Sequence, residues 1–322
     1  MDAMKSPPDM PVLLTSADSA FSMPCAVMLR SVADNLSWTP AVHAVVMDVG
    51  LTARDRRRIR SSVRWTPLSV EFLELSTEAL AGLKVDGHVS KATYARLVAL
   101  DMLKDRFAKC IYIDADFVVL RDIGELWEID LKGFALAAVR DFLADCAGST
   151  HGLIDPGYWG IQAQCPYFNS GLLIIDVLRW RAEQMSSRAI ELIRKHPNKI
   201  RWWDQDALNI LIQGQFLQIG LAWNIHPQAF TWPRVSDLAL LPEDIHRCME
   251  APRAIHFAGP MKPWRNNEEI WGTNHFMRYL YRTAWRDRVP NAPWRKSKIG
   301  LGLWVRRLAQ RIQVWRKVRG VE

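Results

Sequence analysis

CIYIDADFVVL, residues 110–120, carries two carboxylates, one residue apart, within an otherwise apolar run. A run of this kind is typical of a strand that is buried in a sheet. Asp114 and Asp116 interrupt the run where such a strand would end, and a buried charge without a partner costs free energy. We therefore expect something cationic to lie beside these two residues.

Apolar strands and helices alternate along the chain on both sides of this run. The predicted strands are PVLLTSAD (11–18), AVHAVVMDVG (41–50), VEFLEL (70–75), FALAAVRD (134–141), YFNSGLLIIDVLRW (167–180) and the start of RAIHFAGPMKPW (253–264). The predicted helices are FSMPCAVMLRSVADNL (21–36), TARDRRRIRSSV (52–63), SKATYARLVALDML (90–103) and RWWDQDALNILIQ (201–213). This alternation predicts βαβ units, and therefore an α/β fold with a mostly parallel central sheet flanked by helices.

The length and composition are those of a chain with a substantial core. It has 322 residues, 49% of them hydrophobic, which allows one large domain or two smaller ones. We expect a loose N-terminus over 1–10, the main domain over 11–275 and a helical, basic and aromatic tail over 276–322. Residues 142–166 form a loop-rich insertion, and loops of that length are often lids or substrate-binding elements.

The cysteines and the N-terminal segment both favour an intracellular protein. The five cysteines form no C-x-x-C pair and no zinc-like spacing, which is typical of reduced thiols. The segment MDAMKSPPDMPVLL (1–14) lacks the basic start and apolar run of a signal peptide. No stretch approaches the roughly 18 apolar residues of a membrane-spanning helix.

The net charge of +8 is concentrated in the tail. Residues 295–322 hold nine basic side chains and one acid, so residues 1–294 are formally neutral. A neutral body without a nucleic-acid motif counts against a nucleic acid as partner.

Polar residues follow several predicted strands, at the edge where open parallel sheets bind ligands. Asp18 and Asp48 lie at such positions, although each is equally well explained as a helix cap. The amide of Asn169 can bind a sugar hydroxyl or close an Asx-turn. Asp204 and Asp206 precede an apolar helix, where acids also favour the positive end of the helix dipole.

The D-A-D sequence at 114–116 suits a hard divalent ion. In an extended backbone, residues i and i+2 point to the same side. Two carboxylates there would hold Mg²⁺ or Mn²⁺ and leave positions open for phosphate oxygens. The pattern alone is weak, since a capped, solvated turn explains it as well.

The loop HFAGPMKPW (256–264) strengthens the metal interpretation. His256 would be a third ligand, although a lone histidine is more often a structural residue. Lys262 would neutralise a phosphate as a point charge. Gly259 would let the backbone approach a ligand closely.

Together these motifs resemble glycosyltransferase family 8, the retaining enzymes that include bacterial lipopolysaccharide and lipooligosaccharide galactosyl- and glucosyltransferases and glycogenin. The matching stretches, over about residues 11–275, are TSAD (15–18), HVSKATYARL (88–97), CIYIDADFVVL (110–120), AAVRD (137–141), YFNSGLLIID (167–176), DQDALN (204–209) and HFAGPMKPW (256–264). The resemblance implies the GT-A fold of nucleotide-diphospho-sugar transferases.

The resemblance also implies which residues hold the metal and the nucleotide. Asp114 and Asp116 match the metal-binding DxD, with Ala115 between them on the donor, and His256 matches the third ligand. The metal would be Mn²⁺ or Mg²⁺. Gly259 and Lys262 match the loop that grips the diphosphate.

Further positions match those that bind the uracil and the donor sugar. Asp18 occupies the place that pairs with the uracil, although Ser19-Ala20-Phe21 departs from the family pattern after it. The positions that match sugar-holding residues are Arg96, Asp141, Asn169 and Asp204. Gln205 matches the residue beneath the anomeric carbon, on the face opposite the leaving UDP. The insertion 142–166 has no clear counterpart.

The expected reaction is the metal-dependent transfer of galactose or glucose from a UDP-hexose to a glycan acceptor, such as a lipopolysaccharide-type oligosaccharide or another cell-surface glycan. Gln205 is a poor nucleophile, so we favour attack on the same face as departure, in which the leaving phosphate accepts the acceptor proton. Asp204 as nucleophile is the alternative mechanism. A membrane-associated nucleotide-sugar-binding protein without catalysis is the alternative function.

The tail suits an anionic membrane surface. On a helical wheel, one face of LGLWVRRLAQRIQVWRKV (301–318) is apolar and includes Trp304 and Trp315. Arg311 and Arg316 flank this face, and Arg306, Arg307 and Lys317 lie opposite it or nearby. We expect residues 299–318 to associate with the cytoplasmic face of the inner membrane, where a lipid-linked acceptor would lie. The alternative is a helix packed on the body.

Overall fold

The computed structural model describes residues 10–75, 83, 91–103, 106–227, 247–265 and 270–288. The predicted N-terminal segment up to residue 9, the start of the 88–97 motif and the basic segment 299–318 lie outside these residues. Among the described helices, none is long and apolar enough to cross a membrane.

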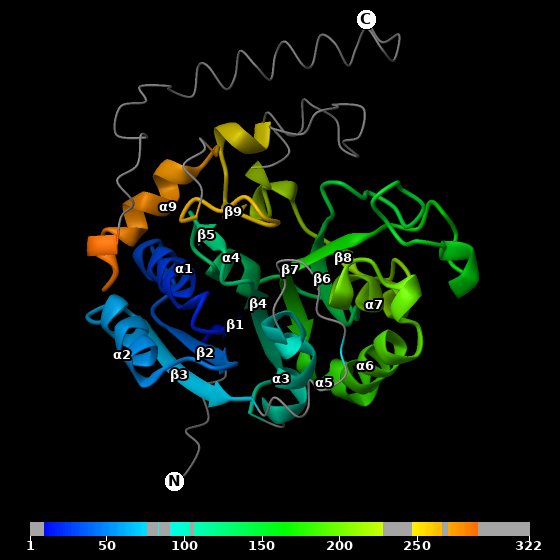
Figure 1. The fold of residues 1–322 in the computed structure, drawn as a ribbon, viewed down its shortest axis with the longest axis horizontal. Coiled ribbons are helices and arrows are strands. Elements are labelled where there is room, and N and C mark those ends of the chain that lie inside the picture. The colour runs from blue at the N-terminus through cyan, green and yellow to red at the C-terminus, as the bar shows by residue number, and fades with distance from the viewer. Residues whose placement is uncertain are drawn as a thin grey trace, which may run out of the picture.

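A seven-stranded sheet forms the centre, in the order β3-β2-β1-β4-β7-β6-β8 (Figure 1). Its strands are β1 (Val12–Ala17), β2 (Val42–Asp48), β3 (Leu68–Glu74), β4 (Lys109–Ile113), β6 (Leu136–Arg140), β7 (Phe168–Asp176) and β8 (Leu217–Gln218). Neighbouring strands are parallel except that β7 runs antiparallel to both β4 and β6. The predicted mostly parallel sheet is confirmed.

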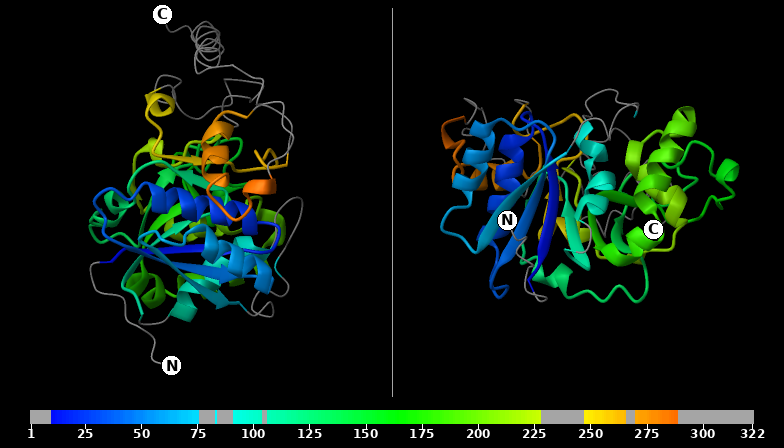
Figure 2. Two further views of the ribbon diagram at one scale, coloured as in Figure 1. Left: turned by 90° about the vertical axis from the view of Figure 1, so that its left-hand side faces the viewer. Right: turned by 90° about the horizontal axis from the view of Figure 1, so that it is seen from below.

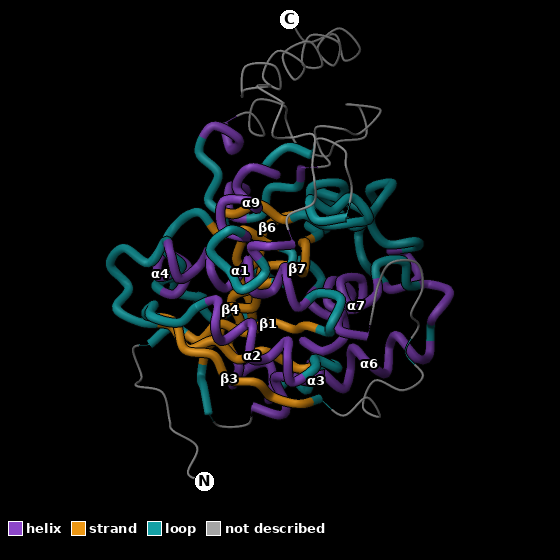
Figure 3. The backbone as a smooth tube through the Cα atoms, turned by 60° about the vertical axis from the view of Figure 1, so that its left-hand side comes forward, coloured by secondary structure: helices purple, strands orange, loops and turns teal. Residues whose placement is uncertain are grey.

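Helices cover both faces of this sheet (Figures 2 and 3). One face packs against α1 (Ser22–Asp34), α2 (Ala53–Ser62) and α9 (Thr273–Leu280). The other packs against α3 (Ala95–Leu103), α5 (Val177–Ala182), α6 (Met185–Lys195) and α7 (Trp203–Ile212). A short helix, α4 (Gly124–Trp127), precedes β6, and 3₁₀ turns lie at Lys91–Tyr94, Pro156–Trp159, Pro197–Lys199, Leu221–Trp223 and Arg286–Arg288.

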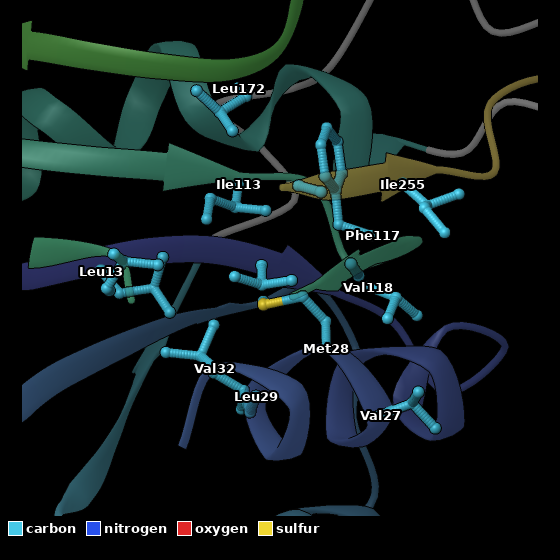
Figure 4. Packing of buried hydrophobic residues seen from close by; sticks show 14 of the residues in the cluster. Leu13, Val27, Met28, Leu29, Val32, Ile113, Phe117, Val118, Leu172 and Ile255 are labelled. Carbon is cyan, nitrogen blue, oxygen red and sulfur yellow. The ribbon is translucent and has the colours of Figure 1, made fainter. Parts of the chain in front are cut away.

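The central strands carry apolar residues on both of their faces because they contribute to two cores. In β1, Leu13 belongs to the core under α1, whereas Val12 and Leu14 belong to the core under α3. Successive side chains of a strand point to opposite faces, so a strand covered on both sides needs apolar residues throughout. Figure 4 shows the first of these cores, in which Met28 and Val32 of α1 pack with Leu13 of β1 and Ile113 of β4.

A second, two-stranded sheet sets the geometry of the site. It pairs β5 (Phe117–Val119) antiparallel with β9 (Ala254–His256), and His256 lies opposite Phe117. This pairing carries the 256–264 loop to the D-A-D motif, which lies directly before β5.

The chain after β9 returns to the first core. Phe276 and Leu280 of α9 are buried with α1, and the amide of Asn35 donates a hydrogen bond of 2.7 Å to the hydroxyl of Tyr279. The predicted boundary at residue 275 therefore falls within a helix of the main body. The division of the chain beyond residue 288 stays a prediction.

The insertion 142–166 connects β6 to β7 and projects at the edge of the molecule (bright green in Figures 1 and 2). Its residues Ala147, Leu153 and Ile161 belong to a small apolar core that also includes Ile200 and, from α7, Ile210. An isolated antiparallel β-bridge between Cys146 and Pro166 holds the two ends of the insertion together.

Candidate active site

A cavity of about 380 Å³ lies beyond the carboxyl ends of β1, β4 and β6. Of the twelve predicted site residues, eleven line it: Arg96, Asp114, Ala115, Asp116, Asp141, Asn169, Asp204, Gln205, His256, Gly259 and Lys262. These residues come from segments that are far apart in the sequence, and the fold brings them together around one cavity. The exception is Asp18.

The D-A-D motif is a turn, and the extended backbone that we predicted for it is wrong. The N–H of Phe117 donates to the carbonyl of Asp114 at 3.2 Å, while the N–H of Asp114 donates to Gly171 of β7 at 2.9 Å. The chain leaves the large sheet at this turn and enters the two-stranded sheet. The two carboxylates converge because of the turn, and β9 brings His256 to them.

Asp114, Asp116 and His256 form a group that can hold a metal ion. One ligand atom from each lies within 4.8 Å of the others. The Nε2 atom of His256 is 3.3 Å from Asp116 Oδ1 and 3.9 Å from Asp114 Oδ2. Two carboxylates and an imidazole suit Mn²⁺, and also Mg²⁺ when phosphate oxygens complete the coordination. The residues present therefore fit a divalent cation.

Lys262 is the cation beside Asp116. The residue is 3% exposed, and its ammonium donates to Asp116 Oδ2 and to the carbonyl of Phe257, both at 2.6 Å. Burial favours the neutral acid, but the charge of Lys262 and the neighbouring His256 ring outweigh it and hold the pKa of Asp116 well below its usual range. The expectation of a cation at the motif is met by this side chain and by Arg96.

Arg96 connects the motif to the start of α7. Its guanidinium lies 2.9 Å from Asp114 Oδ1 and 2.8 Å from Asp204 Oδ2, and it also donates to the carbonyl of Ser170. The hydroxyl of Tyr112 donates to Asp114 at 2.8 Å. Burial raises the pKa of Asp204 to about 6, although the charge of Arg96 opposes the shift.

Neutral amides dominate the opposite end of the cavity. Asn169 Nδ2 donates to Asp141 Oδ2 at 2.9 Å and to Gln205 Oε1 at 3.1 Å. Gln205 Nε2 donates to Asp141 Oδ2 at 3.2 Å. Asn169 Oδ1 accepts the N–H of Gly171 at 3.0 Å, so this residue closes an Asx-turn as well as facing the cavity.

Three other acids accept backbone N–H groups close to the start of a turn or helix. Asp18 Oδ1 accepts the N–H of Phe21 at 3.0 Å before α1, and Asp48 accepts two N–H groups at the end of β2. Asp206 accepts the N–H groups of Arg201 and Trp202 just before α7. Pairing of Asp18 with a uracil stays a prediction.

Sequence reasoning missed several residues of the cavity wall. Trp202 and Trp203 line it directly before Asp204, and His151 contributes from the insertion. The indole of Trp202 donates to the carbonyl of His151 at 2.6 Å, which ties the insertion to the start of α7. The pair of tryptophans beside Asp204 was a visible signal. His226 also lines the cavity, but no sequence pattern indicated it, because its position depends on the β-bridge between Ile225 and Ile255 of β9.

Comparison with known proteins gives a consistent result. Residues 12–268 match the family model of Glycosyl transferase family 8. General stress protein A of Bacillus subtilis is 29% identical over 276 residues, which cover 85% of this chain and 94% of the relative. Lipopolysaccharide 1,3-galactosyltransferase of Salmonella typhimurium is 26% identical, covering 86% of this chain and 77% of the relative. Lipopolysaccharide 1,2-glucosyltransferase of Escherichia coli is 26% identical, covering 73% and 67%.

Among solved structures, the galactosyltransferase LgtC in complex with donor and acceptor sugar analogs superposes with a TM-score of 0.73. The match covers 86% of this chain and 100% of that chain, at 23% identity. At this identity the likeness concerns the fold.

Proposed function

Since this chain belongs to glycosyl transferase family 8 and is a glycosyltransferase with the GT-A fold, we propose that it moves galactose or glucose from a UDP-sugar to a glycan acceptor with retention of configuration. Two of its relatives are named as lipopolysaccharide glycosyltransferases, which supports an acceptor of that class. The observation that carries the proposal is the Asp114, Asp116 and His256 group beside Lys262 in one cavity.

The two ends of the cavity suit the two parts of such a donor. A divalent cation held by Asp114, Asp116 and His256 would act as a Lewis acid on the departing diphosphate. Lys262 would exchange its contact with Asp116 for a phosphate oxygen and stabilise the charge that develops there. The amide groups of Asn169 and Gln205, with Asp141, would orient the sugar.

The surroundings of Gln205 and Asp204 favour attack on the same face as departure. Gln205 is an amide, and its two polar atoms are engaged by Asn169, Ser170 and Asp141. Asp204 is paired with Arg96 at 2.8 Å, which limits its reach as a nucleophile. The leaving phosphate would then take the proton of the acceptor hydroxyl. Asp204 as nucleophile remains the alternative, which trapping of a covalent glycosyl-enzyme would support.

We also propose that residues 299–318 place the enzyme on the cytoplasmic face of an anionic membrane, near a lipid-linked acceptor. The concentration of basic and Trp side chains there supports it. Vesicles with anionic lipids should pellet the full chain but not a chain that lacks 299–322, and high salt should weaken the binding. Equal pelleting of both chains would contradict this role.

The test of the reaction is UDP release from a panel of UDP-sugars, with Mn²⁺ and with EDTA. We expect slow hydrolysis of one UDP-hexose, lost with EDTA and in Asp116→Asn. Asp48→Asn is a matched control, because Asp48 ends a neighbouring strand outside the cavity. If no donor is hydrolysed, calorimetric titration of UDP with Mn²⁺ decides between a strict need for the acceptor and a binding protein without catalysis.

A further inference from the structure

Asn224 lies 1% exposed between the metal-binding histidine and the sugar-binding amides. It follows the 3₁₀ turn Leu221–Trp223 and touches both groups of residues through its two polar atoms. We propose that Asn224 is a positioning residue that sets the ring tautomer of His256 for metal binding and couples that ring to Asn169. This inference rests on the metal site of the proposed function.

The orientation of Asn169 fixes the orientation of Asn224. A backbone N–H can only donate, so the side-chain atom of Asn169 that lies 3.0 Å from the N–H of Gly171 must be its oxygen. The Asn224 atom that lies 2.9 Å from the same oxygen must then be a donor, which is Nδ2. The other polar atom of Asn224 is consequently the acceptor Oδ1.

That acceptor faces two imidazole rings. Asn224 Oδ1 lies 3.0 Å from His256 Nδ1 and 3.0 Å from His226 Nε2. A carbonyl oxygen has two lone pairs, so it can accept both N–H groups. His256 must therefore carry a proton on Nδ1, so Nε2, which faces Asp114 and Asp116, is the ring nitrogen that would bind a metal ion. Partners of this kind fix the tautomer and the ring orientation of metal-binding histidines.

A second backbone donor fixes the orientation of Gln205, the amide at the far end of this series of hydrogen bonds from His256. The N–H of Ser170 donates to Gln205 Oε1 at 3.1 Å, so that atom is the oxygen and the nearby Asn169 atom is Nδ2. The N–H groups of Ser170 and Gly171, two successive residues of β7, thus determine the orientation of each side-chain amide between Gln205 and His256.

Because Gly171 has no side chain, the ring of His256 can pack directly against the backbone of β7. A Cβ atom at this position would lie 2.5 Å from His256 Cε1 and 2.9 Å from His256 Nδ1, closer than side-chain atoms tolerate. The close packing of the His256 ring against the β7 backbone is therefore part of the positioning.

The experiment measures Mn²⁺ binding by the paramagnetic resonance signal of the free ion, without turnover. Asn224→Ala removes the acceptor, and we expect the Kd for Mn²⁺ to rise about 10- to 100-fold. Asn224→Asp keeps an acceptor for His256 but loses the donor to Asn169. We expect it to bind Mn²⁺ within a few-fold of the wild type, while its affinity for a UDP-hexose falls relative to its affinity for UDP.

Asn35→Ala is the matched control. Asn35 also makes three side-chain hydrogen bonds, which join α1 to β5 and α9, but it lies outside the cavity. It should lower the melting temperature and leave the Kd for Mn²⁺ unchanged. If Asn224→Ala does not fold, Asn224→Ser takes its place.

The outcomes separate this inference from the proposed function. Wild-type protein that binds Mn²⁺ with an unchanged Kd in Asn224→Ala overturns the positioning role and leaves the metal site standing. Wild-type protein that binds no Mn²⁺, with or without UDP, overturns both. Equal losses in the alanine and aspartate variants would show that Asn224 is merely structural.

Discussion

The two ends of the cavity are built from different interactions. At the proposed metal end, buried charges face one another, with Lys262 2.6 Å from Asp116 and Arg96 2.9 Å from Asp114. At the proposed sugar end, the amides of Asn169 and Gln205 share hydrogen bonds with the carboxylate of Asp141. Removing one partner of a buried ion pair leaves an uncompensated charge, whereas losing one neutral hydrogen bond costs about 1 kcal/mol. Charge balance governs the first end, and geometry governs the second.

Lys262→Met should have the largest effect, because it removes the buried cation that pairs with Asp116 and that we propose to bind the diphosphate. We expect UDP release to fall by about 10²- to 10³-fold. Arg265→Met, an exposed cation three residues later, is the control and should change it little. A loss of less than tenfold in Lys262→Met would mean that charge balance does not dominate this end.

The pH dependence of stability should have opposite signs at Asp204 and Asp116. The folded protein binds the Asp204 proton more tightly than the unfolded chain does, since the pKa rises from 3.8 to about 6. Asp204 therefore stabilises the fold below pH 3.8, and that contribution is lost as the pH rises through about 6. The free energy involved is about 3 kcal/mol at most.

Urea unfolding in EDTA at several pH values, compared between wild type and Asp204→Asn, measures this contribution. Asp116 should behave in the opposite way, because its pKa is lowered on folding, and its contribution should be lost as the pH falls. Parallel pH profiles for wild type and Asp204→Asn would show that burial of this carboxyl does not shift its pKa.

Gln205→Ala should reduce kcat by about 10- to 100-fold, equivalent to about 1.4 to 2.7 kcal/mol. The substitution removes hydrogen bonds to Asp141 and Asn169 but no charge, so the affinity for UDP should persist. Gln213→Ala, at the end of the same helix, is the control. A collapse of UDP affinity in Gln205→Ala would place this residue with the metal end instead.

Trp202→Phe should have the smallest effect. It keeps an aromatic ring but loses the indole hydrogen bond of 2.6 Å to His151, which should lower the free energy of unfolding by about 1 kcal/mol. Trp65→Phe, at a position 89% exposed, should change it by less. Equal melting temperatures for both variants would mean that this bond does not hold the insertion to α7.

The pattern of apolar residues predicted the fold because the strands of the large sheet are buried on both faces and are therefore rich in apolar residues. The same logic failed at the D-A-D motif, where the chain passes from one sheet to another and local spacing no longer applies. Asp114, Asp116 and Lys262 were visible as motifs. Asn224 and His226 were not, because their roles depend on the bridge between Ile225 and Ile255 and on the pairing of Phe117 with His256. Contacts so distant in sequence leave no local pattern.

The reversed direction of β7 has a consequence for how this fold can diversify. Because β6 and β7 are antiparallel neighbours, the insertion 142–166 leaves and re-enters the sheet at one point, where the N–H of Asp141 donates to the carbonyl of Tyr167 at 2.9 Å. Doubling the length of such a loop costs only about 0.6 kcal/mol in closure entropy. New sequences can therefore be inserted between Asp141 and Asn169, two predicted sugar-binding residues, without altering the register of either strand.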